Sequence, residues 1–313
     1  MSLYVVTGGA GFIGSHLADA LLAQGHAVRV VDDLSTGHRG NLDPRAELLV
    51  GDVADAGLVR RALEGADGVF PLAAIASVDR SNQDWTGTHR TNLGGTVAVL
   101  DGARAAGAIP VVYASSAAIY GDQGEAMIDE RATPGPSTAY GADKLGSELH
   151  ARVAFGVHGV PTMGFRFFNV YGPRQDPASP YSGVISIFAA RIAGGLPLTL
   201  HGDGQQTRDF VYVADVVRHL VAGMAALRAA PQALVLNVCT GRATSVLALA
   251  ETLARLDGRP LRTGFGPARA GDIRASLGNP AKATALLGVP ATTGLEAGLR
   301  LTVRAMAPAK PPQ

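Results

Sequence analysis

The sequence predicts an α/β protein that contains a doubly wound parallel sheet and a smaller mixed unit toward the C-terminus. Short β-branched runs alternate with longer helical patterns over the first part of the 313-residue chain. Such alternation is typical of parallel strands joined by right-handed crossovers. The strand-like runs are almost continuously apolar, as expected where helices cover both faces of a sheet. A glycine-rich segment directly after the first run also fits this class of fold.

The elements can be followed in order along the chain. Strands are expected at residues 3–7, 27–32, 46–52, 67–74, 109–116, 159–169 and 233–238. Helices are expected at residues 12–25, 56–65, 95–107 and from about 140 onward. After residue 170 the segment YGPRQDPASPYSG is rich in proline, glycine and polar residues, which predicts a long loop. A loop of this length in a compact protein is typically functional.

The composition is that of a globular chain without a polyanionic or membrane partner. The chain is 47% hydrophobic and 17% charged, which fits a folded protein with a sizeable core. The net charge of +1 argues against a nucleic-acid surface, and no apolar run reaches membrane-spanning length. Cys239 is the single cysteine, so an internal disulfide framework is excluded and a reducing cytoplasm is expected. No metal site is expected.

The glycine-rich segment TGGAGFIGSH connects the first strand to the first helix. Gly9, Gly11 and Gly14 satisfy G-x-G-x-x-G, and Gly8, Gly11 and Gly14 satisfy G-x-x-G-x-x-G. Glycines allow the backbone to approach a pyrophosphate at the positive end of the helix, although a tight structural turn can show the same motif. Asp32 ends the second strand 18 residues beyond Gly14. An acid there binds the adenosine ribose and repels a 2′-phosphate, so the sequence favours NAD over NADP.

Tyr140 and Lys144 stand four residues apart in STAYGADKLG, where a helix is expected to begin. Residues with this spacing are neighbours on a helix surface, so both side chains can act at one point. A free tyrosine has a pKa near ~10, and a nearby lysine ammonium lowers that pKa by favouring the phenolate. The pair is therefore a candidate catalytic base, although the same spacing also arises by chance.

Together these motifs resemble the extended short-chain dehydrogenase/reductase family, and most closely its UDP-galactose 4-epimerase group. They run in the family's order over nearly the whole chain. The matching segments are TGGAGFIGSH, VVDDLSTG, GDV, PLAAIASV, TNLGGT, YASSAAIYGD, YGADK, RFFNVYGPRQ, GDGQQTRDFVYVAD and ARAGDI. The resemblance implies an NAD-binding Rossmann domain formed by residues 1–169 and about 210–239. It implies a nucleotide-sugar-binding domain formed by about 170–209 and 240–306. The proline-rich end at 307–313 predicts a frayed tail.

The resemblance also implies roles for individual residues. The expected catalytic residues are Tyr140, Lys144 and Ser116. The expected cofactor contacts are Gly8, Gly11, Phe12, Ile13, Gly14, Asp32, Asp33, Gly37, Asp52, Val53, Leu72, Ala73, Ala74, Asn92, Tyr140 and Lys144. The expected substrate contacts are Ser115, Ser116, Tyr140, Asn169, Val184, Arg208, Arg269, Asp272 and Ser276.

For several of these residues the resemblance implies a more specific role. Asn92 corresponds to a buried asparagine that steadies the active-site helices, and Asp52 corresponds to an adenine contact. Asn169 corresponds to a contact with the substrate phosphates. Arg208 and Arg269 correspond to the arginines that hold the diphosphate, for which a planar guanidinium is well suited. Without the family, each isolated charge would be read as a solvated surface residue.

The resemblance implies an isomerase that interconverts UDP-glucose and UDP-galactose through a transient 4-keto intermediate while NAD stays bound. Tyr140 is expected to take the proton of the sugar 4-hydroxyl as C4 gives its hydride to the nicotinamide. A family dehydratase or decarboxylase would carry an acid soon after the active-site serine, where Ala117–Ala118 stand. A UDP-glucuronate 4-epimerase, or another NAD-dependent nucleotide-sugar enzyme, remains the alternative. The intact pair of Tyr140 and Lys144 disfavours a non-catalytic NAD-binding regulator.

The size of the residue at position 276 is expected to decide which sugars fit the substrate site. In the epimerases, the residue seven positions after the arginine of R-x-G-D lies beside the C2 substituent, and from Arg269 this residue is Ser276. A tyrosine there excludes an N-acetyl group, whereas serine leaves room for it. We therefore expect UDP-GlcNAc and UDP-GalNAc to be accepted too. If the loop alignment slips by one residue, Ala275 and Leu277 are also smaller than tyrosine.

The family also implies the partners of the chain. Its members commonly form homodimers through two helices from each subunit. This predicts a homodimer built on residues 92–106 and 140–155. A UDP-sugar is the expected substrate, with no nucleic-acid and no membrane partner.

Overall fold

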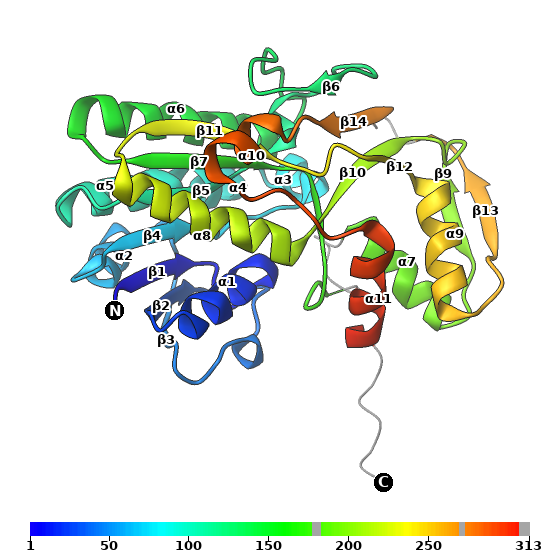
Figure 1. Cartoon of the computed structure of the whole chain (residues 1–313), viewed down its shortest axis with the longest axis horizontal. Helices are drawn as coiled ribbons and strands as arrows, with labels where there is room; N and C mark the ends of the chain where they lie inside the picture. Colours follow the sequence, from blue (N-terminus) through cyan, green and yellow to red (C-terminus); the bar gives the residue numbers. More distant parts are fainter. Residues whose placement is uncertain (177–182, 269–272, 307–313) are drawn as a thin grey trace, which may run out of the picture.

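The computed structural model describes residues 1–176, 183–268 and 273–306, and its largest element is a seven-stranded sheet (Figure 1). The strand order is β11-β7-β5-β4-β1-β2-β3, and every neighbouring pair is parallel. The strands are β1 (Leu3–Thr7), β2 (Ala27–Asp32), β3 (Glu47–Val50), β4 (Gly68–Pro71), β5 (Val111–Ser116), β7 (Thr162–Phe167) and β11 (Ala233–Val238). The prediction of a doubly wound parallel sheet is confirmed, and each strand lies within a segment expected to be a strand.

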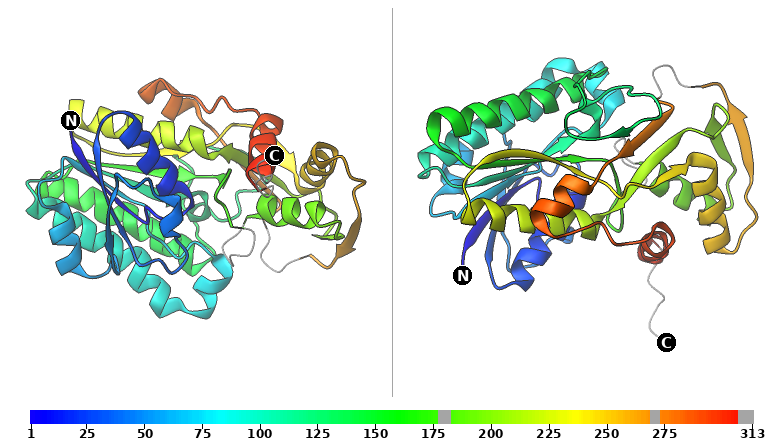
Figure 2. Two further views of the ribbon diagram at one scale, coloured as in Figure 1. Left: turned by 90° about the horizontal axis from the view of Figure 1, so that it is seen from below. Right: turned by 45° about the horizontal axis from the view of Figure 1, so that its top comes forward.

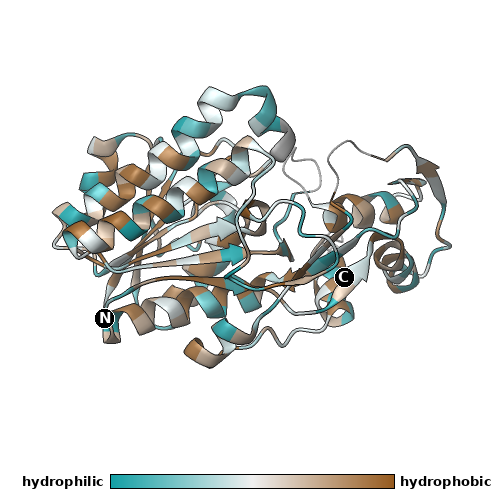
Figure 3. Cartoon of the chain, turned by 90° about the horizontal axis from the view of Figure 1, so that it is seen from above, coloured by the Kyte–Doolittle hydropathy of each residue, from teal (hydrophilic) through white to brown (hydrophobic). Residues whose placement is uncertain are grey.

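Helices cover both faces of this sheet (Figure 2). One face carries α1 (Phe12–Ala23), α8 (Val213–Ala229) and α10 (Ala281–Leu287), and the other carries α2 (Ala56–Leu63), α5 (Gly95–Ala105) and α6 (Ala139–His158). Tyr4 and Val6 of β1 pack with α1 and α8, while Val5 between them packs with α2 and α5. Figure 3 shows brown, the colour of hydrophobic residues, along parts of the central strands, with white and teal toward their arrowheads. Burial of both faces explains the continuous apolar runs in the sequence.

A second sheet of five strands lies beside the first, to the right in Figure 1. Its order is β12-β10-β14-β6, and β8 also pairs with β10. The strands are β6 (Met127–Ile128), β8 (Asn169–Tyr171), β10 (Thr207–Tyr212), β12 (Ala243–Ser245) and β14 (Ala275–Gly278). A two-stranded sheet pairs β9 (Leu198–His201) with β13 (Thr263–Gly266). The helices α7 (Val184–Ala193), α9 (Val246–Asp257) and α11 (Leu295–Met306) share a separate core with β9 and β10.

The chain passes between the two sheets more often than the expected domain boundaries suggest. β6 lies within residues 1–169, yet Met127 and Ile128 pair with Leu277 and Gly278 of β14. Conversely, α10 lies within residues 240–306 but packs against β11 and α8 of the first sheet. A two-residue strand has no periodicity that a sequence pattern could reveal.

Short helical segments that the sequence does not predict connect β4 to α5. They are α3 (Val78–Gln83), α4 (Trp85–His89) and the π-helical turn η2 (Arg90–Gly94). Such π-turns inside helices are typical of functional sites. Two further short turns are η1 (Arg39–Asn41) and η3 (Ala117–Ile119). Within the described residues, no helix combines the length and apolarity needed to cross a membrane. The expected tail at 307–313 lies outside these residues.

Candidate active site

A cavity of about 530 Å³ lies along the carboxyl edge of the seven-stranded sheet. β1 stands where the strand order reverses, with β4 on one side and β2 on the other. Ligands of open α/β sheets bind in the crevice at such a point. The segments after β1, β2, β3 and β4 all contribute to the wall, and the volume is typical of a small-molecule site.

The turn between β1 and α1 leaves no room for a side chain at its first glycine, and the same holds for Gly14 in the first turn of α1. Gly8 has φ +69°, and a Cβ there would lie 2.7 Å from the backbone nitrogen of Ala73. A Cβ on Gly14 would collide with the carbonyl oxygen of Gly8. Gly11 caps α1 without a side-chain hydrogen bond, and the first turn of α1 contains no acidic residue. The helix therefore presents its N–H groups and positive dipole end to the cavity, which is the arrangement that suits a pyrophosphate.

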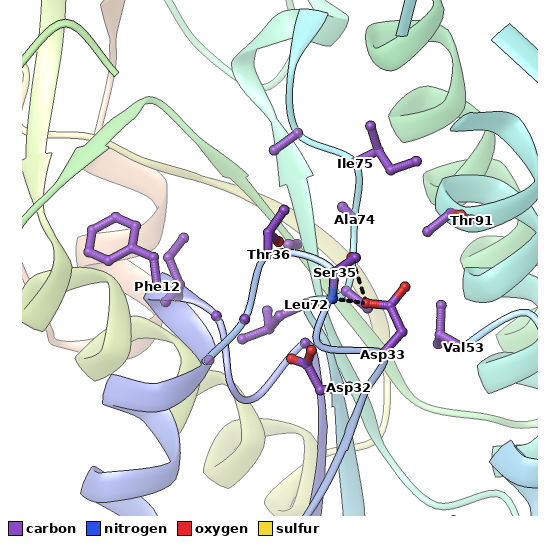
Figure 4. A pocket seen from close by; sticks show the side chains of 18 of the residues that line it. Phe12, Asp32, Asp33, Ser35, Thr36, Val53, Leu72, Ala74, Ile75 and Thr91 are labelled. Atoms are coloured by element: carbon purple, nitrogen blue, oxygen red, sulfur yellow. Dashed lines mark hydrogen bonds between the residues drawn. The ribbon is translucent and has the colours of Figure 1, made fainter. Parts of the chain in front are cut away.

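Asp32 fixes this turn from the end of β2. It is 7% exposed, and its Oδ2 accepts the N–H of Ala10 while its Oδ1 accepts the N–H of Leu34, both at 2.9 Å. Burial raises the pKa of this carboxyl, and the two backbone hydrogen bonds oppose that effect. Asp33 stands next to it at the cavity and accepts hydrogen bonds from the N–H and hydroxyl of Ser35 (Figure 4). The two acids give this part of the wall a negative charge, which suits ribose hydroxyls and opposes a 2′-phosphate.

Most of the predicted cofactor contacts line the cavity. They are Gly8, Gly11, Phe12, Ile13, Gly14, Asp32, Asp33, Gly37, Asp52, Val53, Leu72, Ala73 and Ala74. The wall also contains polar residues that the sequence did not single out, among them Arg90, Thr91 and Gln175. Thr91 and Gln175 lie within the matching segments TNLGGT and RFFNVYGPRQ, although neither was given a role, whereas Arg90 on the π-helical turn lies outside every matching segment.

Asn92 supports the cavity without lining it. Its Oδ1 accepts the N–H of Ile75 at 2.8 Å, and its Nδ2 donates to the carbonyl oxygen of Ile75 at 3.1 Å. Asn92 is 1% exposed and lies on η2. These bonds hold the segment after β4, which forms part of the cavity wall. The side chain of Asn92 therefore fixes this loop, and its part in steadying the active-site helices stays a prediction.

Tyr140 and Lys144 lie in the first two turns of α6, whose start is capped by the hydroxyl of Thr138. The Nζ of Lys144 lies 5.8 Å from the centroid of the Tyr140 ring and donates to the carbonyl oxygen of Ala114 at 2.9 Å. Ala114 lines the cavity, whereas Tyr140 and Lys144, both predicted cofactor contacts, are not among its lining residues, so the ammonium lies behind the wall at Ala114. Burial lowers the pKa of Lys144 to about 8, and the neighbouring carboxylate of Asp143 opposes this effect.

The pKa of Tyr140 moves in the opposite direction from the one expected. In the chain alone, burial raises it above its ordinary value, and a hydrogen bond with Ser116 lowers it in part. The expectation rested on the nearby lysine, but desolvation of the buried hydroxyl is the largest influence on this pKa, and the group that lowers it is Ser116. Formation of the phenolate therefore requires further positive charge beside the ring.

Ser115 and Ser116 end β5 and have different surroundings, because successive side chains on a strand alternate in direction. Ser116 is hydrogen-bonded to Tyr140. Ser115 is 1% exposed, and its hydroxyl donates to the carboxylate of Glu148 on α6. The structure thus brings Ser116, Tyr140 and Lys144 together and places Ser115 away from the predicted substrate contacts.

Glu148 belongs to a buried polar network that the sequence analysis missed. Its carboxylate accepts two hydrogen bonds from Arg166 on β7, at 2.9 and 2.7 Å. Arg166 also donates to the hydroxyl of Tyr120 at 2.9 Å, and that hydroxyl donates to the Oδ1 of Asn237 at 2.6 Å. The network fixes α6 against β7 and β11. A signal was present, because Glu148 follows Lys144 by four residues and so shares its side of α6.

The remaining predicted substrate contacts lie toward the second sheet. Those that the structure describes there are Asn169, Val184, Arg208 and Ser276. Arg208 on β10 and Ser276 on β14 are paired in register, so they are direct neighbours. Asn169 opens β8 and is paired in register with Phe210 of β10. Ser276 lies on a strand and not on a loop. Arg269 and Asp272 lie outside the described residues.

The fold and the site define a dinucleotide-dependent enzyme of the extended short-chain dehydrogenase/reductase type. The model of the NAD-dependent epimerase/dehydratase family matches residues 4–239. The chain belongs to this family, and its cofactor is NAD.

Individual relatives are similar over nearly the whole chain. The UDP-glucose 4-epimerase of Mycolicibacterium smegmatis is 36% identical over 306 residues and 96% of each chain. The UDP-glucose 4-epimerase of Thermotoga maritima, solved with UDP-glucose, has a TM-score of 0.92 at 36% identity, over 97% of this chain and 98% of that one. A UDP-N-acetylglucosamine 4-epimerase of Methanobrevibacter ruminantium, solved with UDP-N-acetylmuramic acid, has a TM-score of 0.91 at 30% identity over 97% of both chains. The family resemblance in the sequence motifs is confirmed.

Proposed function

We propose that this protein is a nucleotide-sugar 4-epimerase that interconverts UDP-glucose and UDP-galactose. The observation that carries the proposal is the grouping of Ser116, Tyr140 and Lys144, in which Lys144 donates to the carbonyl oxygen of Ala114, a residue that lines the NAD cavity. The names of the relatives support the substrate, because the similar proteins of M. smegmatis and T. maritima are UDP-glucose 4-epimerases.

The chain has residues suited to bind the pyrophosphate, the adenosine ribose and the nicotinamide ribose of NAD. The start of α1 with Gly11 and Gly14 would hold the pyrophosphate, and Asp32 would hold the adenosine ribose. Lys144 would reach the nicotinamide ribose from behind the wall at Ala114. The chemistry that bound NAD supplies is a reversible hydride transfer at C4 of the sugar, together with the positive charge of its oxidised ring.

The chain's own residues account for the movement of the proton. Ser116 orients the sugar 4-hydroxyl, and Tyr140 as phenolate takes the proton from that hydroxyl. The Nζ of Lys144 lies 5.8 Å from the centroid of the Tyr140 ring, and a nearby positive charge favours the phenolate. Tyr140 returns the proton to the same oxygen after the hydride has come back on the other face. The cycle therefore consumes neither a proton nor an electron.

The second sheet is the proposed sugar-nucleotide side. Arg208 would bind the diphosphate, and Ser276, its neighbour in register, would lie beside the C2 substituent. We extend the proposed substrates to UDP-GlcNAc and UDP-GalNAc, because serine is small. The 30% identical UDP-N-acetylglucosamine 4-epimerase of M. ruminantium supports this extension.

Incubation of the purified protein with UDP-glucose, followed by NMR for UDP-galactose, tests the proposal. We expect Tyr140→Phe to lower turnover by about a thousandfold or more, because the base is lost, while NAD remains bound. Tyr4→Phe is the control, since Tyr4 is the second residue of β1 and its hydroxyl accepts a hydrogen bond from Arg228, while Tyr4 does not line the cavity. Undiminished turnover by Tyr140→Phe would sink the assignment of Tyr140. Turnover of UDP-glucuronate alone would favour the uronate epimerase instead.

We further propose that the chain works as two units. Residues 1–169 and about 210–239 would hold NAD, and about 170–209 and 240–306 would hold the sugar nucleotide. The membership of the strands in two sheets supports this division, with β6 and α10 as the exceptions described above.

The single Cys239 supports a place in the reducing cytoplasm.

The proposed assembly is a homodimer formed through α5 and α6. Leu149, Val153 and Val157 on α6 follow one another at four-residue spacing and are 52, 55 and 69% exposed. Val97 on α5 is 36% exposed. Apolar side chains that share one helix face and remain exposed typically mark an association surface.

A further inference from the structure

Arg90 and Asp52 form an ion pair at one end of the NAD cavity. The Nη2 of Arg90 lies 2.6 Å from the Oδ2 of Asp52. Asp52 follows β3, whereas Arg90 lies on η2, 38 residues further along the chain. Both residues line the cavity. The pair therefore joins two separate elements of the cavity wall.

The pair lies toward the adenosine half of the cofactor. Phe12 lies at the start of α1, where the pyrophosphate is expected to bind. Asp32 lies where the adenosine ribose is expected to bind. Figure 4 shows Val53 and Thr91 on the far side of Asp32 and Asp33 from Phe12. Val53 and Thr91 directly follow Asp52 and Arg90 in the sequence. Beyond the ribose, this end of the cavity is where the adenine base must lie.

The ion pair between Arg90 and Asp52 is expected to contribute little to folding stability. The side chains of Arg90 and Asp52 are 67 and 34% exposed, and solvent screens ion pairs of this kind. The carboxylate is nevertheless held firmly, because its Oδ1 accepts the N–H of Ala54 at 2.8 Å. A fixed carboxylate in turn restricts the orientation of the guanidinium plane.

We propose that Arg90, held by Asp52, is a positioning residue that stacks on the adenine of bound NAD and slows its release. A guanidinium is planar and weakly hydrated, and it stacks well on the flat face of a base. The carboxylate of Asp52 keeps acceptor capacity for the amino group of the same base. The inference depends on NAD binding, which family membership gives, and not on which sugar is the substrate.

The release of NAD from the loaded enzyme tests this role. Protein saturated with NAD is passed rapidly into NAD-free buffer, and the bound fraction is followed over time by gel filtration and absorbance. We expect Arg90→Ala to release NAD about tenfold faster, which corresponds to about 1.4 kcal/mol. Arg90→Lys keeps the charge but loses the planar group, so it should restore only a small part of the difference.

Arg104→Ala is the matched control. Arg104 also makes an exposed ion pair, with Asp101 at 2.7 Å, but neither residue lines the cavity. Its release rate should equal that of the unchanged protein, and all variants should keep the same circular dichroism. Unchanged release from Arg90→Ala would overturn the proposal, and so would equal acceleration by Arg104→Ala. If Arg90→Ala does not fold, unchanged release from Arg90→Lys would also overturn it. Sugar turnover is not part of the readout, so failure of the proposed epimerase activity is detected separately.

Discussion

Lys144 is 3% exposed, although the proposed chemistry uses its positive charge. Burial lowers its pKa from 10.5 to about 8, because removal from water disfavours the charged form. A folded-state pKa below the unfolded-state pKa means that the charged lysine destabilises the fold at pH 7, here by about 3 kcal/mol. Lys144 therefore lowers the folding stability at pH 7, while its positive charge is used in the proposed reaction.

We predict that Lys144→Met removes epimerase turnover and raises the free energy of unfolding at pH 7 by about 1–3 kcal/mol. The gain is less than the full penalty because the hydrogen bond to Ala114 is lost. The destabilisation by Lys144 is fully present below pH 8 and disappears as the pH rises from about 8 toward 10.5. Urea unfolding at pH 7 and at pH 10 should therefore show a smaller gain at the higher pH.

Lys282→Met provides the control for this experiment. Lys282 also donates to a backbone carbonyl, that of Val235 at 3.0 Å, but it is exposed. Its substitution should change the unfolding free energy little at either pH. A protein that loses stability at pH 7 on Lys144→Met would contradict the argument.

Ser276 is the residue at which the choice of sugar should be adjustable. We predict that Ser276→Tyr lowers kcat/KM for UDP-GlcNAc at least about 100-fold and for UDP-glucose by less than about tenfold. The reason is steric, because the tyrosine would fill the space beside the C2 substituent. Ser276→Ala should keep both activities. Equal losses for both substrates on Ser276→Tyr would show that this residue does not face the sugar.

At the residue scale, the sequence identifies which residue types form the site better than it predicts where their side chains point or how burial changes their pKa. The spacing of Tyr140 and Lys144 predicts their proximity, because a helix fixes it. Nothing in the sequence decides whether Ser115 or Ser116 reaches Tyr140, since this depends on how β5 ends against α6. The tyrosine pKa was expected to fall, because the extent of burial cannot be read from a motif. Arg90 could not be found either, since the π-helical turn that places it has no pattern of its own.

At the element scale, α6 carries both the proposed catalytic pair, Tyr140 and Lys144, and the exposed apolar stripe proposed as the subunit interface. We predict that Val153→Glu, at the centre of the stripe, converts the homodimer into a monomer. A charge buried against the partner without a counter-charge would make association unfavourable. Light scattering at micromolar protein concentration measures the mass.

Val50→Glu is the matched substitution, because Val50 is 52% exposed and lies on the edge strand β3. It should leave the mass unchanged. The dimer proposal fails if the unchanged protein already has the mass of a monomer.

The two sheets also differ in how much of each could be predicted. The parallel strands are foreseeable because both of their faces are buried, so each is a nearly unbroken apolar run. β6, β8 and β12 contain only two or three residues, which is too short for any period to appear. Their pairing is decided by the tertiary structure around β10. The sequence therefore predicts the cofactor side in detail and the sugar side only through family motifs.

At the scale of the whole molecule, the two sides are interleaved along the chain. After β8 and β10 the chain returns to the first sheet through α8 and β11, and then adds β12 and β14 to the second. We therefore predict that both sides unfold in one thermal transition. NAD at about 100 times its Kd should stabilise the whole molecule by about 2.7 kcal/mol. Scanning calorimetry with and without NAD measures the shift of the midpoint.

NADP at the same concentration serves as the control ligand. Asp32 and Asp33 oppose its 2′-phosphate, so it should raise the midpoint less than NAD does. Two separate transitions, of which NAD shifts only one, would contradict the idea that the interleaved sides unfold together.

The pairing of β6 with β14 also orders events during synthesis on the ribosome. Met127 emerges well before its partner Leu277, whereas the last strand of the first sheet ends at Val238. At ~5–20 residues per second, β6 waits on the order of ten seconds for its neighbour. The parallel sheet can assemble during that interval. The nascent enzyme thus gains the means to capture its cofactor before it has completed the place for a sugar.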